Sequence, residues 1–143
     1  MPVDYSKLAP GQRISDQNYT LDADAVSNYT EAVGDRSRLR KSADGRDLAP
    51  PMAVAALSLR GVVRDLDIPG GTLHVGQELS FIEVVPIGET LACRATLSQN
   101  SVRGGWRFMV VQLEVADSKG RMVMAGKSTI TLPASGGQPP SPR

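Results

Sequence analysis

The sequence predicts an α+β fold in which an antiparallel sheet of about five strands is wrapped round one long helix. Residues 50–66 are helical in pattern and apolar on most sides, and residues 73–132 alternate between apolar and polar side chains in four runs. The length of 143 residues suits one domain and is too short for two ordinary ones. We therefore expect one domain at residues 13–133, an N-terminal arm at 1–12 and a disordered tail at 134–143.

A short strand and a short helix are expected before the long helix. Residues 13–21 carry isolated apolar side chains, which favours a strand. Asp22 can cap a helix whose apolar positions recur every three or four residues, and Gly34 can end it as the residue after the last turn. Residues 35–49 are polar and have no periodicity, so we expect a long exposed loop of the kind that often carries function.

The long helix is the element that the rest of the chain is expected to cover. Pro50 and Pro51 stand at its start, where a missing N–H costs nothing, and the DIPGG sequence at 67–71 ends it. Its large apolar residues surround the axis, which predicts a helix buried on most sides. These residues are Met52, Val54, Leu57, Leu59, Val62, Val63 and Leu66.

Four strands are expected after this helix, at residues 73–85, 91–98, 106–116 and 122–132. The first should place Leu79 and Phe81 on one face and His74 on the other, and the second should end in a loop at 99–101. An open sheet leaves its edge strands unpaired. Pairing two such units edge to edge satisfies them, so we expect a homodimer or a related heterodimer.

Composition and charge exclude several classes of function. Sixteen basic and fifteen acidic residues give a formal net charge of +1, which predicts no nucleic-acid or membrane partner. The single Cys93 rules out an internal disulfide framework and a cysteine-based zinc site, and its place among core residues predicts a buried, inert thiol. No metal is expected. The N-terminus has no apolar signal segment, which favours a cytoplasmic protein.

Three segments resemble the MaoC-like hydratases and dehydratases. They are YTEAVGD at 29–35, APPM at 49–52 and, most specifically, LHVGQELSFIEVVPIGET at 73–90, and the resemblance covers residues 14–133. It implies a single hot-dog domain without a cofactor, acting on acyl thioesters of coenzyme A or of acyl carrier protein. Members of this family add water to a trans-2-enoyl group or remove it from a 3-hydroxyacyl group, as dimers or fused double domains.

The catalytic pattern of that family is incomplete in this chain. Asp35 matches the aspartate of the Asp-x4-His motif, but Arg40 occupies the histidine position. Pro51 stands where the family has a glycine whose N–H polarises the thioester carbonyl, and Ala56 stands at the supporting serine. The chain therefore resembles the non-catalytic types, namely the N-terminal half of fused dehydratases (FAS1-like dehydratase) and the substrate-binding subunits of two-subunit enzymes.

Candidate site residues follow from this comparison. Asp35 and His74 are the catalytic candidates, although the structural reading is favoured for each of them. The arginines of the 35–49 loop can meet phosphate or an acidic carrier protein, or can be a solvated surface. The candidate substrate-binding residues are Arg36, Arg38, Arg40, Lys41, Pro51, Met52, His74 and Arg103. Trp106, Phe108 and Met109 can line an acyl tunnel, although core packing is the default for apolar strand residues.

The sequence leaves three functions open. The leading expectation is an acyl-thioester-binding, catalytically incomplete subunit of an (R)-specific enoyl-CoA hydratase or 3-hydroxyacyl dehydratase, paired with a homologous hot-dog subunit. A second is a self-sufficient enzyme, either a hydratase using His74 and Asp35 or a thioesterase using Glu78 or Glu83. The third is a non-enzymatic homodimer that binds acyl ligands.

Overall fold

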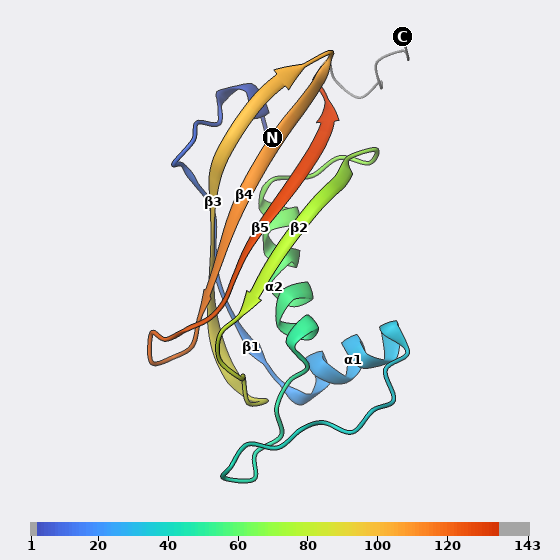
Figure 1. Ribbon diagram of the computed structural model, residues 1–143, viewed down its shortest axis with the longest axis vertical. Coiled ribbons are helices and arrows are strands. Elements are labelled where there is room, and N and C mark those ends of the chain that lie inside the picture. Colours follow the sequence, from blue (N-terminus) through green and yellow to red (C-terminus); the bar gives the residue numbers. More distant parts are fainter. Residues whose placement is uncertain (1–2, 135–143) are drawn as a thin grey trace.

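A five-stranded antiparallel sheet curls around one long helix in the computed structural model, which describes residues 3–134 (Figure 1). The strand order is β1-β3-β4-β5-β2, which confirms the predicted fold class. The elements are η1 (Tyr5–Lys7), β1 (Arg13–Leu21), α1 (Ala23–Val33), α2 (Pro51–Asp65), β2 (Leu73–Phe81), β3 (Glu89–Arg103), β4 (Trp106–Ala116) and β5 (Met122–Pro133). Apart from Ala134, the predicted tail lies outside the described residues, as do Met1 and Pro2 of the predicted arm.

The ends of α1 follow the capping residues that the sequence supplies. The side chain of Asp22 accepts a hydrogen bond from the N–H of Ala25 at 2.8 Å. Gly34 ends the helix with a φ of 71°, a left-handed conformation that only glycine adopts without strain. Both predictions made for this helix are confirmed, and together they turn the chain into the loop at 35–49.

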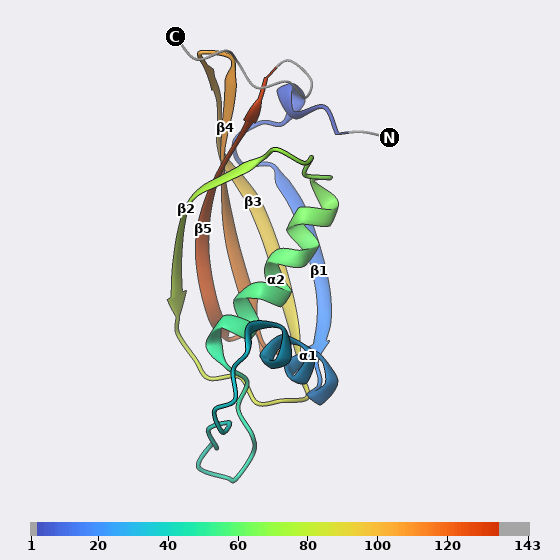
Figure 2. The ribbon, with the colours of Figure 1, turned by 90° about the vertical axis from the view of Figure 1, so that its right-hand side faces the viewer.

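The long helix α2 lies in front of the concave face of the sheet (Figure 2). Its inner side is buried through Val54, Ala55 and Val62. Its outer side is open: Met52 and Val63 are 49% and 50% exposed. The expectation that this helix is buried on most sides is therefore wrong for the single chain, because no described element covers its outer side.

β2 and β3 differ from the sequence prediction in extent, and each carries a β-bulge. β2 ends at Phe81, four residues short of the expected limit, and carries a bulge between His74 and Gly76. The bulge turns His74 onto the same face as Leu79 and Phe81, which corrects the predicted alternation. β3 carries a bulge between Leu97 and Gln99 and then continues to Arg103, so the loop expected at 99–101 is a paired strand instead.

Side-chain hydrogen bonds fix α2 against β1. The hydroxyl groups of Tyr19 and Ser58 are 2.6 Å apart, and Ser58 is 1% exposed. Near the end of the helix, Asp65 Oδ2 accepts hydrogen bonds from Ser15 Oγ at 2.7 Å and from Gln17 Nε2 at 2.8 Å. These contacts hold the helix in place and so position its first turn at the lower end of the sheet.

Cys93 lies in the core below the same helix. Its Sγ–H donates to the carbonyl of Ser58 at 3.4 Å, and burial raises the pKa of the thiol to about 11. The prediction of a buried cysteine is confirmed, and a thiol with such a pKa is protonated at neutral pH, which supports the expected inert role. Within residues 3–134, no helix is long and apolar enough to cross a membrane.

Candidate functional site

A cavity of about 490 Å³ opens near the residue at which β2 ends, which is the lower end of the molecule in Figure 1. It lies between the start of α2, the loop at 35–49 and the segment at 81–85. Its wall is mostly apolar and is formed by residues from all of these elements together with β5. The apolar side chains include Leu39, Leu48, Val54, Phe81, Val85 and Val123.

The loop at 35–49 is tied to the cavity wall by main-chain hydrogen bonds. The N–H of Leu48 donates to the carbonyl of Arg40 at 2.8 Å, and the N–H of Ala49 donates to the carbonyl of Val85 at 2.8 Å. Lys41 Nζ donates to Asp47 Oδ1 at 2.7 Å and closes the loop on itself. The long exposed loop that the sequence predicts is thus exposed, but its second half is fixed against the rest of the fold.

Asp35 lines the cavity, but its environment does not suit a general base. Its Oδ1 accepts hydrogen bonds from the hydroxyl of Ser37 at 2.5 Å and from the N–H of Ser37 at 2.9 Å. These hydrogen bonds, the hydroxyl first, hold the pKa of the Asp35 carboxyl below its ordinary value. A general base works best with a pKa near the operating pH, so this shift goes in the wrong direction.

Three of the other candidates also line the cavity. They are Arg38, Arg40 and Pro51, and Glu83 joins them from the opposite wall. Among the described residues, no carboxylate forms an ion pair with Arg38 or Arg40. Pro51 has no N–H, and the N–H of Ala53 donates to the carbonyl of Pro50 at 2.9 Å. No histidine or cysteine is found among the lining residues of the described chain.

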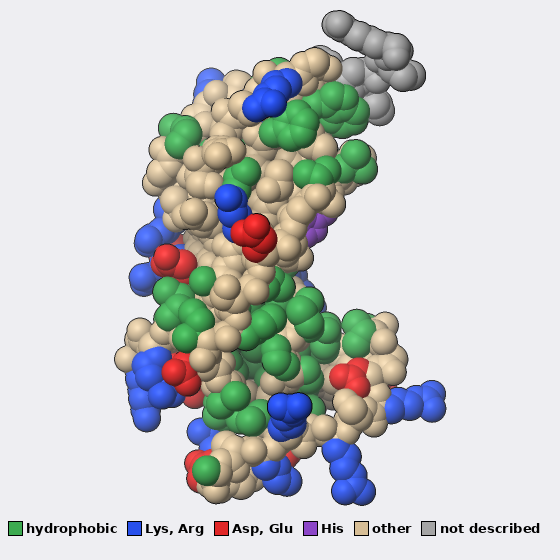
Figure 3. All heavy atoms as spheres, in the orientation of Figure 1, with side chains coloured by type: hydrophobic (Ala, Val, Ile, Leu, Met, Phe, Trp, Pro, Cys, Tyr) green, Lys and Arg blue, Asp and Glu red, His purple; other side chains and the backbone are tan. Residues whose placement is uncertain are grey.

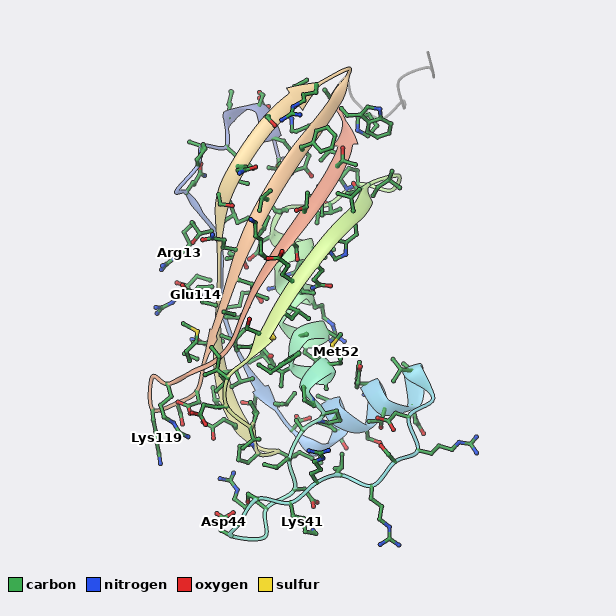
Figure 4. All side chains as sticks on the ribbon, in the orientation of Figure 1. Arg13, Lys41, Asp44, Met52, Glu114 and Lys119 are labelled. Atoms are coloured by element: carbon green, nitrogen blue, oxygen red, sulfur yellow. The ribbon has the colours of Figure 1, made fainter. Side chains whose placement is uncertain are left out.

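The remaining candidates lie elsewhere. Arg36, Lys41, Met52, His74 and Arg103 do not line this cavity. His74 is near the far end of β2, roughly 20 Å from Phe81 along the strand at about 3.3 Å per residue. In Figure 4 Met52 lies on the outer side of α2, away from the sheet. Their assignment to a site stays a prediction.

The serine expected to support the site has no local replacement. Ala56 is exposed on the outer side of α2. Ser58, two residues later, faces the core and is paired with Tyr19. The helix therefore presents no hydroxyl group to the cavity from either position.

Sequence analysis did not identify residues 81–85 as a wall of the cavity. Alternation predicts a continuous strand there, whereas Ile82 and Val84 are 53% and 63% exposed and Val85 is 4% exposed. The signal was the run FIEVVP before the turn, since Ile82 and Val84 are apolar residues on the face that alternation assigns to solvent. The tyrosine–serine pair was missed too, because no sequence pattern links residues 39 positions apart.

Comparisons with known proteins agree with this architecture. Residues 9–126 match the model of the family described as the FAS1-like dehydratase domain region. No curated protein matches by sequence. Among solved structures, R-hydratase PhaJ1 from Pseudomonas aeruginosa is similar with a TM-score of 0.75 and 19% identity, over 97% of this chain and 94% of that one.

Two structures from Mycobacterium tuberculosis are also similar. One is a protein with a double hot-dog fold, with a TM-score of 0.78 and 21% identity over 98% of this chain and 47% of that chain. The other is the HadBC 3R-hydroxyacyl-ACP dehydratase complex, with a TM-score of 0.69 and 17% identity over 92% and 100% of the two chains. At these identities the similarity establishes a shared hot-dog fold.

Proposed function

Because the chain belongs to the FAS1-like dehydratase family, within the MaoC-like hot-dog dehydratases, we propose that it is the substrate-binding subunit of a two-subunit enzyme. The enzyme is an (R)-specific enoyl-CoA hydratase or a 3-hydroxyacyl dehydratase. This subunit binds an acyl thioester and is catalytically incomplete alone. A homologous hot-dog partner supplies the acid and base.

The observation that carries this proposal is the set of polar groups around the cavity. Hydration of an enoyl thioester needs a group that exchanges a proton near neutral pH and a donor that polarises the carbonyl. Arg40 stays protonated at any working pH and cannot act as the base. The lowered pKa of Asp35 makes its carboxylate a weaker base, and Pro51 has no N–H to donate to the thioester carbonyl. The cavity thus favours binding over catalysis.

The same cavity suits an acyl chain. Its apolar wall offers favourable burial, worth ~25 cal/mol for each Å² of apolar surface removed from water. Arg38 and Arg40 line the cavity and are exposed, so their guanidinium groups can meet an anionic or carbonyl oxygen of the ligand. An amphipathic ligand with an apolar chain and a polar head fits this distribution.

The partner is proposed to dock on β2 and on the outer side of α2. β2 is an edge strand, so its outer main-chain groups are free for a further strand in the described structure. Leu73 and Val75 on this strand are 52% and 54% exposed, and Met52 and Val63 on α2 are exposed as well. Large apolar residues exposed on an edge strand and on a helix are typical of a protein interface. The similar HadBC dehydratase is a complex, which favours a second hot-dog chain as the partner.

The test is hydration of crotonyl-CoA after co-expression with a hot-dog chain that carries an intact Asp-x4-His motif. We expect activity in the purified complex and its loss when the partner's motif histidine is replaced. Asp35→Asn in this chain should leave that activity within about twofold, since the carboxylate is not the base. Loss of all activity in the Asp35→Asn complex contradicts the proposed division of roles.

A second candidate function is favoured by one further residue. Glu83 lines the cavity and has no ion-pair partner in the described chain, so a carboxylate-assisted acyl-CoA thioesterase is chemically possible. Release of free thiol from decanoyl-CoA by the chain alone, abolished by Glu83→Gln and retained in Glu78→Gln, identifies this activity. No thiol release above the buffer rate excludes it.

A further inference from the structure

A second, smaller pocket lies beside the large cavity. It has a volume of about 90 Å³ and is lined by Arg46 from the loop, Glu89 from the start of β3, and Asp117, Lys119 and Arg121 from the turn between β4 and β5. At ~30 Å³ per water molecule, this space equals about three waters, so it suits a compact polar group. No sequence motif pointed to it, because its cations come from two distant segments.

The two spaces are neighbours. Val84, Val85 and Val123 line both of them. Val84 is 63% exposed, so its side chain lies at the surface between the two openings.

The acidic groups of the small pocket are already occupied. Asp117 accepts hydrogen bonds from the N–H groups of Lys119 and Arg121 and from Arg121 Nε, each at 2.9 Å. Glu89 Oε1 accepts from the N–H of Ser118 at 3.0 Å and from its hydroxyl at 2.5 Å. These bonds lower the pKa values of both carboxyls and keep them ionised.

The basic side chains of the pocket form fewer bonds within the described chain than its carboxylates do. Neither Arg46 nor Lys119 forms an ion pair within the described chain, and the Arg121 guanidinium uses its Nε on Asp117. Figure 3 shows basic side chains gathered around the lower end of the molecule, beside a hydrophobic surface. In Figure 4 Lys119 projects outward from its turn. Arginine and lysine donors beside a small polar space are a usual means of binding phosphate.

We propose that Arg46, Lys119 and Arg121 bind a phosphate group of the ligand whose apolar chain lies in the large cavity. The inference rests on the proposed function, and it assigns the head group of the acyl thioester to a place outside the cavity. Two sources share this chemistry. One is a phosphate of coenzyme A, and the other is the phosphopantetheine arm of a carrier protein.

The test compares three probes that carry the same acyl chain. They are decanoyl-CoA, decanoyl-phosphopantetheine and decanoyl-pantetheine, and only the last of these lacks phosphate. Each probe is titrated by calorimetry into the protein in its assembled form. Arg46→Gln combined with Lys119→Gln should weaken binding of a phosphate-bearing probe by about tenfold or more. Binding of decanoyl-pantetheine should stay unchanged. A matched control, Arg13→Gln combined with Lys127→Gln, removes the same charges from β1 and β5 and should change none of the three.

Each outcome separates the hypotheses. Weaker binding of both phosphate-bearing probes places the phosphopantetheine phosphate in the pocket, and weaker binding of decanoyl-CoA alone places a nucleotide phosphate there. Equal effects of the double variant on all three probes, or no effect on any, overturn the phosphate site while leaving the acyl cavity intact. Failure of the unaltered protein to bind decanoyl-pantetheine, with or without a partner, overturns the proposed function itself.

Discussion

The two edges of the sheet differ in how far the chain itself completes them. β1 is fastened to α2 by Tyr19, Ser15 and Gln17, and its apolar Leu21 is buried. β2 has exposed apolar residues on a strand that no described helix covers. Both are edge strands with unpaired outer main-chain groups in the described structure, but only β1 is joined to α2 by side-chain hydrogen bonds. The cavity opens where β2 ends, so a partner chain docked on β2 as proposed would lie beside the site.

The largest effect is expected on the association of chains, which a charge on β2 should weaken and a charge on β1 should not. Val75→Lys on β2 places a charge in the proposed interface and should weaken association by about 100-fold, because a desolvated charge without a partner is costly. Asn18→Lys makes a comparable change on β1, where no interface is proposed, and should leave association unchanged. Sedimentation equilibrium of both variants, alone and with a co-expressed hot-dog chain, measures this contrast. Equal weakening by the two substitutions contradicts it.

A smaller effect is expected from the tyrosine–serine pair that completes the β1 side. Tyr19→Phe leaves the buried hydroxyl of Ser58 without its side-chain partner and should lower the free energy of unfolding by ~1–3 kcal/mol. Urea denaturation measures this change. Adding Ser58→Ala to Tyr19→Phe should recover part of the loss, since both polar partners are then absent. Ser80→Ala on exposed β2 serves as the control and should change stability little.

Asp65, at the end of α2, should make the stability of the protein depend on pH. Hydrogen bonds from Ser15 and then Gln17 hold the pKa of Asp65 below its ordinary value. The native state therefore binds this proton less tightly than the unfolded state. The stabilisation is present above the unfolded pKa of about 3.9 and is lost as the pH falls through the lower native value. Asp65→Asn should lower the melting temperature at pH 7, with the difference shrinking below about pH 4. A difference that grows at acidic pH contradicts this sign.

The smallest effect is expected where α2 approaches β1 most closely. A Cβ at Gly61 would lie 2.7 Å from the Cδ of Gln17, so Gly61→Ala must displace the side chain that donates to Asp65. Alanine favours a helix over glycine by ~1 kcal/mol, and the lost hydrogen bond costs a similar amount. We expect a net change within about 0.5 kcal/mol. In a Gln17→Ala background the same substitution should stabilise the protein by ~0.5–1 kcal/mol, and a loss there contradicts the account.

The order and type of the elements could be predicted because they depend on local patterns. Asp22 and Gly34 mark the ends of α1, and alternation marks the strands. The bulge after His74 could not be predicted, since it inserts one residue without changing the composition of the strand. For the site, the resemblance identified Asp35, Arg40 and Pro51, which the fold brings to one cavity. The opposite wall, with Glu83, depends on where β2 stops, and the sequence pattern does not fix that point.

We propose that this chain binds an acyl thioester without carrying the complete chemistry. The most direct test is the hydration rate of crotonyl-CoA with the purified chain alone, at high protein concentration and neutral pH. We predict no rate above the uncatalysed reaction, because Arg40 and Pro51 replace the groups that the reaction needs. A measurable rate that is lost in Asp35→Asn or His74→Ala would contradict the claim and identify a self-sufficient hydratase.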